Sequence, residues 1–261
     1  MDLTLLIALV GAAAWLPQIF LWAYKWLVKP QLRFAPENIS EIGYTSFGLI
    51  LNQTFAISTS KKDALIEKIT LSVKHESGAT HDFYWDYLDE KGAEMITTTG
   101  ERAEFRKNQK AIALKISTLG LVEKKIYFRD ISFQQNLQPL MSTFIDKALY
   151  LDKTEGDNAK EKASKTKEFL DVLDCIKKSF DWREGKYTVS LYAYETSLRK
   201  PHIERYEFAL SRSQVELLDK NIEITQESLK DLVLYIARDP NERPKRFWHW
   251  INPSFYRANK R

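Results

Sequence analysis

Residues 69–87, ITLSVKHESGATHDFYWDY, decide the predicted fold. Apolar side chains occupy every second position on both sides of a polar turn: Ile69, Leu71 and Val73, then Phe83, Trp85 and Tyr87. A period of two is typical of a strand with one buried face and one solvated face. The stretch therefore predicts a β-hairpin with one face in a core.

Similar alternating runs continue on both sides of this hairpin, separated by turn residues. They cover residues 31–35, 42–51, 54–59, 65–75, 81–88, 111–117 and 124–133. A second hairpin is expected from Tyr187–Ala193 and Ile203–Leu210. Short strands at roughly 10-residue spacing favour an antiparallel sandwich over a parallel sheet. We therefore expect a mainly β protein with helices (α+β), built on an immunoglobulin-like β-sandwich that the second hairpin completes.

Two segments have helical patterns. Residues 136–180 are predicted to be a helical insertion, whose second helix carries a stripe at Phe169, Val172, Leu173, Ile176 and Phe180. Near the carboxyl end, Ser213–Glu216 forms a capping box, and Thr225 is expected to cap a further helix.

The amino terminus contains an uncharged run from Leu3 to Tyr24. As a helix it would be about 33 Å long, close to the hydrocarbon thickness of a bilayer. Aromatic and lysine side chains at its end are typical of the membrane interface: Trp22, Tyr24, Lys25, Trp26 and Lys29. The run predicts a transmembrane helix.

Two alternatives compete with this anchor. A secretory signal peptide has positive charge before its apolar run, where this chain has only Asp2, although Ala12–Ala14 matches a small-residue cleavage site. A helix buried in a protein core is the other, but such a long uncharged run is unusual there. The anchor is the better interpretation.

The charges beside the helix predict its orientation. Lys25, Lys29 and Arg33 follow it, whereas Asp2 precedes it, so the positive-inside rule places the folded part in the cytoplasm and the amino terminus outside. The lone Cys175 agrees with a reducing compartment. The glycosylation sequons at Asn38 and Asn52 argue for a lumen, but such short patterns arise often by chance.

Pro17 and Gln18 lie near the middle of this helix. One interpretation is a tolerated kink in which Gln18 finds a local partner. The other is self-association into an oligomer, because Gln18 can bond across helices and small residues permit close approach: Ala8, Gly11 and Ala12.

The carboxyl-terminal tail concentrates the positive charge of the 261-residue chain. Residues 243–261 contain six basic side chains and no acidic one, and without them the formal net charge falls from +4 to −2. A nucleic-acid surface is therefore not expected. The tail mixes aromatic and basic side chains, among them Trp248, Trp250 and Arg246. This mixture is typical of a segment that lies on an anionic membrane leaflet. The equal alternative is that the aromatic side chains pack on the domain.

Few residues suggest chemistry. The sequence has no glycine-rich phosphate loop, no His-Glu-x-x-His and no Gly-x-Ser-x-Gly motif. His75 and His81 would face each other across a regular hairpin, but two ligands without a third make a weak metal site. Cys175 and the carboxylate pairs Asp82/Asp86 and Asp171/Asp174 fit ordinary helix and strand faces. We therefore expect no catalytic, cofactor or metal residues and no enzyme.

The sequence thus predicts an anchor at 1–29, a folded domain at 30–240 and a basic, aromatic tail at 241–261. The leading functional hypothesis is a single-pass membrane protein that presents its domain to a protein or small-ligand partner. The second is a membrane-disrupting effector of antiviral-defence type, in which a signal received by the domain drives assembly of the transmembrane helices. The third is a hydrolase or binding enzyme on the outer face, which needs the opposite orientation.

Overall fold

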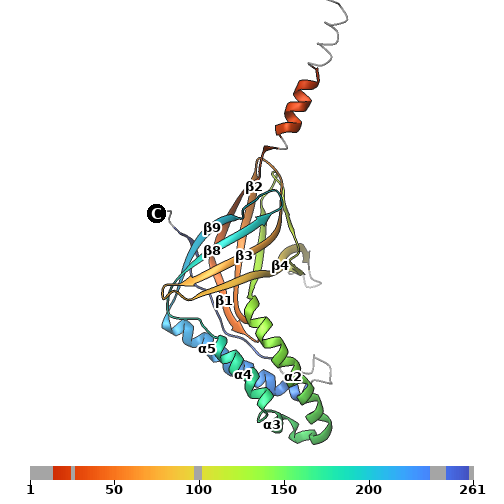
Figure 1. Ribbon diagram of the computed structural model, residues 1–261, viewed down its shortest axis with the longest axis vertical. Coiled ribbons are helices and arrows are strands. Elements are labelled where there is room, and N and C mark those ends of the chain that lie inside the picture. The colour runs from red at the N-terminus through yellow and green to blue at the C-terminus, as the bar shows by residue number, and fades with distance from the viewer. Residues whose placement is uncertain (1–13, 25–26, 97–101, 236–244, 259–261) are drawn as a thin grey trace, which may run out of the picture.

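The computed structural model describes residues 14–24, 27–96, 102–235 and 245–258. Its body is a curled antiparallel sheet, shown in Figure 1. Its longer strands are β1 (Gln31–Thr45), β2 (Gly48–Ser60), β3 (Ala64–His75), β4 (Thr80–Ile96), β5 (Arg102–Lys110), β7 (Val122–Asp130), β8 (Gly185–Glu195) and β9 (His202–Leu210). Its short strands are β6 (Leu114–Ile116), β10 (Trp250–Ile251) and β11 (Tyr256–Arg257).

The sheet closes on itself through the C-terminal segment, residues 245–258. The strands follow the order β10-β1-β2-β7-β4-β3-β8-β9-β11, with β5 beside β4 and β6 beside β3. Because β10 and β11 both belong to the C-terminal segment, this segment joins β1 to β9 and covers part of each edge. Covered edges protect strands from pairing with other chains.

The α+β class with mostly antiparallel strands is confirmed. An immunoglobulin-like sandwich, the finer expectation, would consist of two hydrogen-bonded sheets. The described strands instead form one continuous sheet. Curling brings the two walls together around a shared core, so each strand still alternates as in a sandwich. The hairpin β8–β9 does complete the sheet, because β8 pairs with β3.

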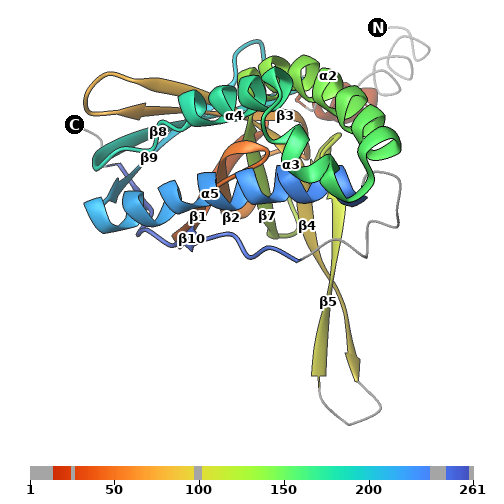
Figure 2. The ribbon, with the colours of Figure 1, turned by 90° about the horizontal axis from the view of Figure 1, so that it is seen from below.

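The helices lie together at one end of the sheet, as Figures 1 and 2 show. They are α2 (Ile131–Glu155), the 3-10 turn η1 (Gly156–Asn158), α3 (Ala159–Ala163), α4 (Lys167–Ser179) and α5 (Arg212–Tyr235). Four members of the stripe expected on α4 are buried, Phe169, Val172, Leu173 and Ile176, whereas Phe180 follows the end of the helix and is half-buried. An aromatic cluster lies in the core of the sheet: Trp182, Phe83, Tyr187 and Phe208.

Two helix boundaries differ from the predictions. Helix α2 begins at Ile131 because the Asp130 carboxylate accepts from the backbone N–H groups of Ser132 and Phe133. Helix α5 is continuous, and its first turn is capped through Ser211 and Gln214. Thr225 lies within that helix and donates to the Asn221 carbonyl, so it caps nothing.

The strand directions define two ends of the sheet. At the helix end lie the turns at 45–48 and 76–79 and the junctions with the helices, and at the opposite loop end lie 61–63, 117–121 and 196–201. Because β1 starts at the loop end, the N-terminal helix (residues 14–24) leaves the sheet there, as Figure 1 shows. Within the described ranges, no helix has both the length and the apolar character needed to cross a membrane.

Candidate functional site

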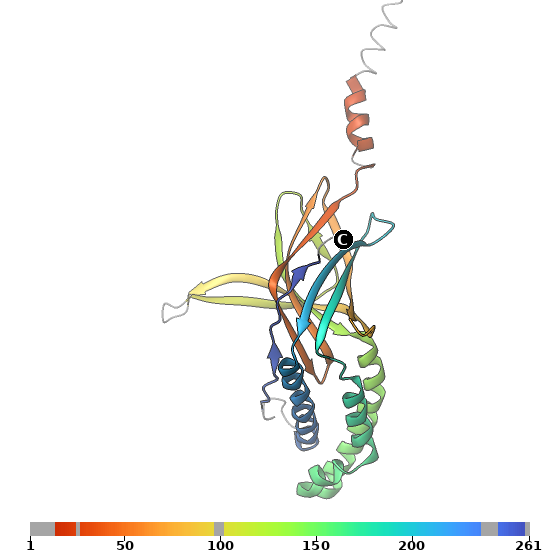
Figure 3. The same cartoon turned by 90° about the vertical axis from the view of Figure 1, so that its left-hand side faces the viewer.

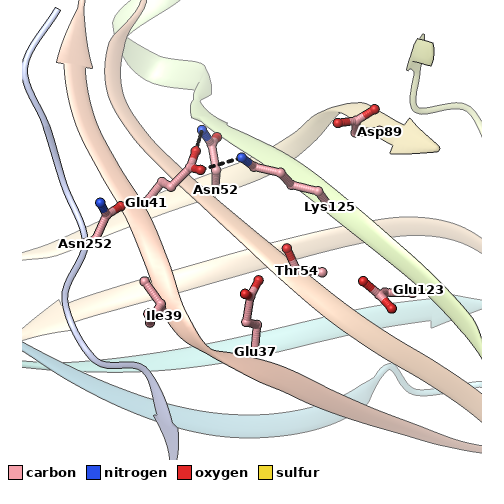
Figure 4. A pocket seen from close by; sticks show the side chains of 9 residues that line it. All are labelled: Glu37, Ile39, Glu41, Asn52, Thr54, Asp89, Glu123, Lys125 and Asn252. Atoms are coloured by element: carbon pink, nitrogen blue, oxygen red, sulfur yellow. Dashed lines mark hydrogen bonds and ion pairs between the residues drawn. The ribbon is translucent and has the colours of Figure 1, made fainter. Parts of the chain in front are cut away.

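A groove of about 460 Å³ lies on the outer face of the sheet. Figure 4 shows its lining, which comes from β1, β2, β7, β4 and the C-terminal segment: Glu37, Ile39, Glu41, Asn52, Thr54, Asp89, Glu123, Lys125 and Asn252. We call it the outer groove.

Strand register explains why these side chains meet. Glu41 lies opposite Asn52, and Lys125 lies opposite both Thr54 and Asp89. Their neighbours Ile42, Leu51 and Ile126 are buried in the core, so the groove residues face outward by strand alternation. A bulge in β1 between Pro36 and Ser40 changes the local alternation beside Glu37 and Ile39.

The outer groove is acidic. Glu41 pairs with Lys125 at 2.5 Å and accepts from the Asn52 side-chain amide at 3.3 Å. Its lining holds four carboxylates against one ammonium group, a formal charge of −3. Among the described residues, the carboxylates of Glu37 and Glu123 have no ion pair. Two negative charges therefore remain free of a protein counterion.

Asn52 adds an unsatisfied acceptor. Its side chain is only 3% exposed, and its Oδ1 has no hydrogen-bond partner within the described part of the chain. A buried carbonyl without a donor costs free energy, because water no longer bonds to it. The groove thus combines acceptors and negative charge, which suits a ligand carrying N–H donors.

The predicted anchor residues are only partly described. The N-terminal helix contains Gln18, Trp22 and Tyr24, all exposed, and Lys29 follows it. Ala8, Gly11, Ala12, Lys25 and Trp26 lie outside the described residues. The predicted membrane-interface and helix-association roles therefore stay predictions.

The C-terminal segment has the second of its two expected arrangements, packed on the domain. Arg246 pairs with Asp231 of α5, and Asn221 of α5 bonds to the backbone of His249. Trp248 is half-buried, and the ring of Trp250 lies against Gly43. These residues gather at the helix end, opposite the N-terminal helix (Figure 1).

The two histidines of the first hairpin have separate partners. The turn is tighter than expected, with the His75 N–H bonded to the Ala79 carbonyl, so His81 pairs with Val73 and not with His75. His75 Nδ1 lies 2.8 Å from Ser77 Oγ, and His81 Nε2 lies 2.7 Å from Asp181 Oδ2. The described residues contain no cluster of three side chains that could hold a metal ion.

The other candidates for chemistry have ordinary surroundings. Burial raises the pKa of the Cys175 thiol, which disfavours the reactive thiolate. Asp86 pairs with Arg129 at 2.9 Å, and Asp174 pairs with Lys178 one helical turn away at 2.7 Å. Asp82 and Asp171, their expected companions, form no ion pair within the described part of the chain.

Sequence reasoning missed the outer groove. Glu41 and Asn52 are 11 positions apart, but Lys125 of β7 is 36 positions from Asp89 and 71 from Thr54. Nothing local in the sequence indicates that β7 lies between β2 and β4. The sequon Asn52 is the one groove residue that the sequence analysis singled out, for an unrelated reason. No known protein family matches the chain, and no curated protein sequence is significantly similar to it.

Proposed function

We propose that this chain is a membrane-anchored binding protein whose outer groove takes a polycationic ligand. In this proposal the apolar amino terminus, residues 1–29, holds the protein in a bilayer. The folded domain lies on the cytoplasmic side, as the positive charges after the helix predict.

The surroundings of the N-terminal helix support the anchor. Residues 14–24 carry large apolar side chains on every side, and these are exposed: Trp15, Leu16, Ile19, Phe20, Leu21, Trp22 and Tyr24. A helix that is apolar all round is stable only where apolar material surrounds it. The domain does not supply that material, so a lipid environment accounts for the helix best.

The groove's unsatisfied acceptors carry the ligand proposal. Asn52 Oδ1 lacks a donor, and Glu37 and Glu123 lack counterions among the described residues. A chain of ammonium groups supplies both N–H donors and positive charge. The volume of about 460 Å³ falls within the range of small-ligand sites.

Binding fits the lining better than catalysis. The described residues that line the groove offer carboxylates, amides, one threonine, one isoleucine and one ion-paired lysine, with no histidine or cysteine among them. Such a lining provides recognition by hydrogen bonds and charge. We therefore propose a recognition protein, not an enzyme.

The first prediction tests the groove with spermine and with tetralysine, which share the ammonium chemistry but differ in backbone. Full-length protein in detergent micelles should bind at least one of them in titration calorimetry. The double variant Glu37→Gln/Glu123→Gln should bind about tenfold more weakly, because it loses two charge-assisted contacts. Glu67→Gln/Glu223→Gln, two exposed glutamates outside the groove, is the matched control.

Equal weakening by both double variants would show a diffuse charge effect and contradict a groove site. If neither spermine nor tetralysine binds, a polycationic ligand is contradicted. The anchor is tested separately by flotation of the full chain with vesicles, which should be lost without residues 1–29. Toxicity on expression that requires residues 1–29 would favour the membrane-disrupting effector instead.

A further inference from the structure

Three connections at the loop end form one surface, which we call the loop rim. They are the β2–β3 turn at 61–63, the β6–β7 loop at 117–121 and the β8–β9 loop at 196–201. Figures 1 and 3 show these connections at the end of the sheet from which the N-terminal helix departs.

Side-chain hydrogen bonds hold the loop rim together. The Asp63 carboxylate accepts from the Thr118 backbone N–H at 2.8 Å and from its hydroxyl at 3.1 Å. Thr196 donates from its N–H and its hydroxyl to the Leu65 carbonyl, at 3.2 and 3.1 Å. The rim therefore presents a fixed set of side chains and does not need to order on contact.

The tip of the β6–β7 loop is apolar and exposed. Leu119 is 96% exposed and Leu121 is 64% exposed, in a loop, Ser117–Leu121, that has no charged residue. Neither leucine belongs to the core. Because both leucines are exposed to water, moving them into an apolar medium lowers the free energy.

The flanking connections are basic. Lys61, Lys62, Arg199 and Lys200 are exposed, and Asp63 is the one acidic side chain in these three connections, so their formal charge is +3. Lys61 also has a φ of 70°, a left-handed conformation that glycine adopts more easily. Lysine at this position is less stable than glycine would be, but it adds a positive charge to the β2–β3 turn.

We propose that the loop rim rests on an anionic lipid surface, with Leu119 and Leu121 entering the interface and the basic residues contacting headgroups. Apolar tips flanked by cations match the boundary between acyl chains and anionic headgroups. The rim also shares its end of the molecule with the N-terminal helix. This inference rests on the membrane attachment proposed above.

The contact would fix the orientation of the domain. The sheet would stand with its loop end on the membrane, and helices α2–α5 would face away from it. Trp248 and Trp250 would then lie at the far end and could not reach the same leaflet, in contrast to the first of the two arrangements expected from the sequence.

The test uses full-length protein carrying Cys175→Ala and Leu119→Cys, labelled with an environment-sensitive fluorophore. The label should be quenched by spin-labelled lipid in vesicles of phosphatidylcholine and phosphatidylserine at 3:1. Leu170→Cys is the matched control, since Leu170 is 53% exposed on α4 at the helix end. Its label should stay unquenched.

Charge variants test the lipid preference. Replacing Lys62, Arg199 and Lys200 with Gln should reduce quenching at residue 119 several-fold in phosphatidylserine vesicles, and added salt should reduce it in the parent protein. Lys61→Gly should lower the quenching and raise the melting temperature, because it removes a charge and a strained backbone. A lowered melting temperature would contradict the interpretation of Lys61.

Flotation of the same vesicles separates the possible failures. Flotation without quenching at residue 119 overturns the rim contact and leaves the anchor standing, and it would leave the two leucines as a protein docking surface. Loss of flotation overturns both proposals. Equal quenching at residues 119 and 170 also overturns the stated orientation.

Discussion

Glu204 joins strands β9 and β1, which do not pair with each other directly. Its carboxylate is buried and accepts from the Phe34 N–H at 3.2 Å, from His202 at 3.0 Å and from the Tyr206 hydroxyl at 3.1 Å. Arg257 of β11 pairs with it as well. Burial by itself would raise the pKa of this carboxyl, but these hydrogen bonds and the Arg257 charge lower it. The Glu204 side chain therefore links β1 and β9 at Phe34, where the two strands share no backbone hydrogen bonds.

The residue-scale prediction is that Glu204→Gln lowers the free energy of unfolding by roughly 2 kcal/mol, because bonds to a charged acceptor are the stronger ones. Equilibrium urea denaturation at pH 7 measures this. Glu207→Gln on the same strand should change stability by less than about 0.5 kcal/mol. Equal losses of unfolding free energy in the two variants would show that the contacts of Glu204 stabilise the fold no more than those of Glu207.

His81 connects both junctions of the helical insertion to the first hairpin. One ring nitrogen lies 3.8 Å from Asp130, which caps α2, and the other lies 2.7 Å from Asp181, which follows α4. Arg183 also pairs with Asp181. The nearby carboxylate of Asp130, and then that of Asp181, raise the pKa of His81 against the opposing effect of burial. For Asp130, burial acts to raise the pKa, but the nearby His81 ring and hydrogen bonds from the Ser132 N–H and hydroxyl and the Phe133 N–H lower it.

The element-scale prediction concerns pH. Because the folded-state pKa of His81 is raised, its stabilisation is complete below about pH 6.5 and is lost as the pH rises through the folded value. His81→Gln should cost about 1.5–3 kcal/mol at pH 6 and much less at pH 9. Denaturation at both pH values tests this, with His249→Gln as the control.

A pH-independent cost of His81→Gln would contradict the charge assignment. Acid acts in the opposite direction through Asp130. Its lowered pKa means that its contribution is present above its ordinary value and disappears as the pH falls through the folded one.

The C-terminal segment determines the shape of the whole molecule. Its backbone bonds to β1 through the Ser40 N–H and the Asn38 carbonyl, and to β9 through the Arg205 carbonyl. The Phe255 ring, 1% exposed, stacks on Tyr206 at 5.2 Å between ring centroids. The last residues of the chain thus complete a core that the first strands begin.

The whole-molecule prediction is that Phe255→Ala lowers the free energy of unfolding by about 3–5 kcal/mol, the usual cost of emptying a buried phenylalanine site. Phe247→Ala, 85% exposed in the same segment, should change it by less than about 0.5 kcal/mol. Urea denaturation of the two variants tests this. Similar small effects would mean that the segment does not close the sheet.

The sequence by itself determined the local features of this protein. The period-two runs marked the hairpins, and the spacing of apolar residues from Phe169 to Ile176 marked a buried helix face. These predictions worked because alternation within one strand or helix depends on neighbours a few positions apart. Strand β5 was not predicted from the sequence. A helix boundary was predicted at Thr225, inside α5, although no glycine or proline interrupts the chain there.

Only the tertiary structure decided which strands are neighbours. The single curled sheet, the outer groove, the loop rim and the closure at Glu204 all depend on contacts between residues far apart in the sequence. Alternation tells which face a side chain takes, but it leaves the partner strand and the register open. Those are selected by burial of the whole core at once, so Glu37 and Glu123, or Leu119 and Lys61, became sites only when the chain had folded.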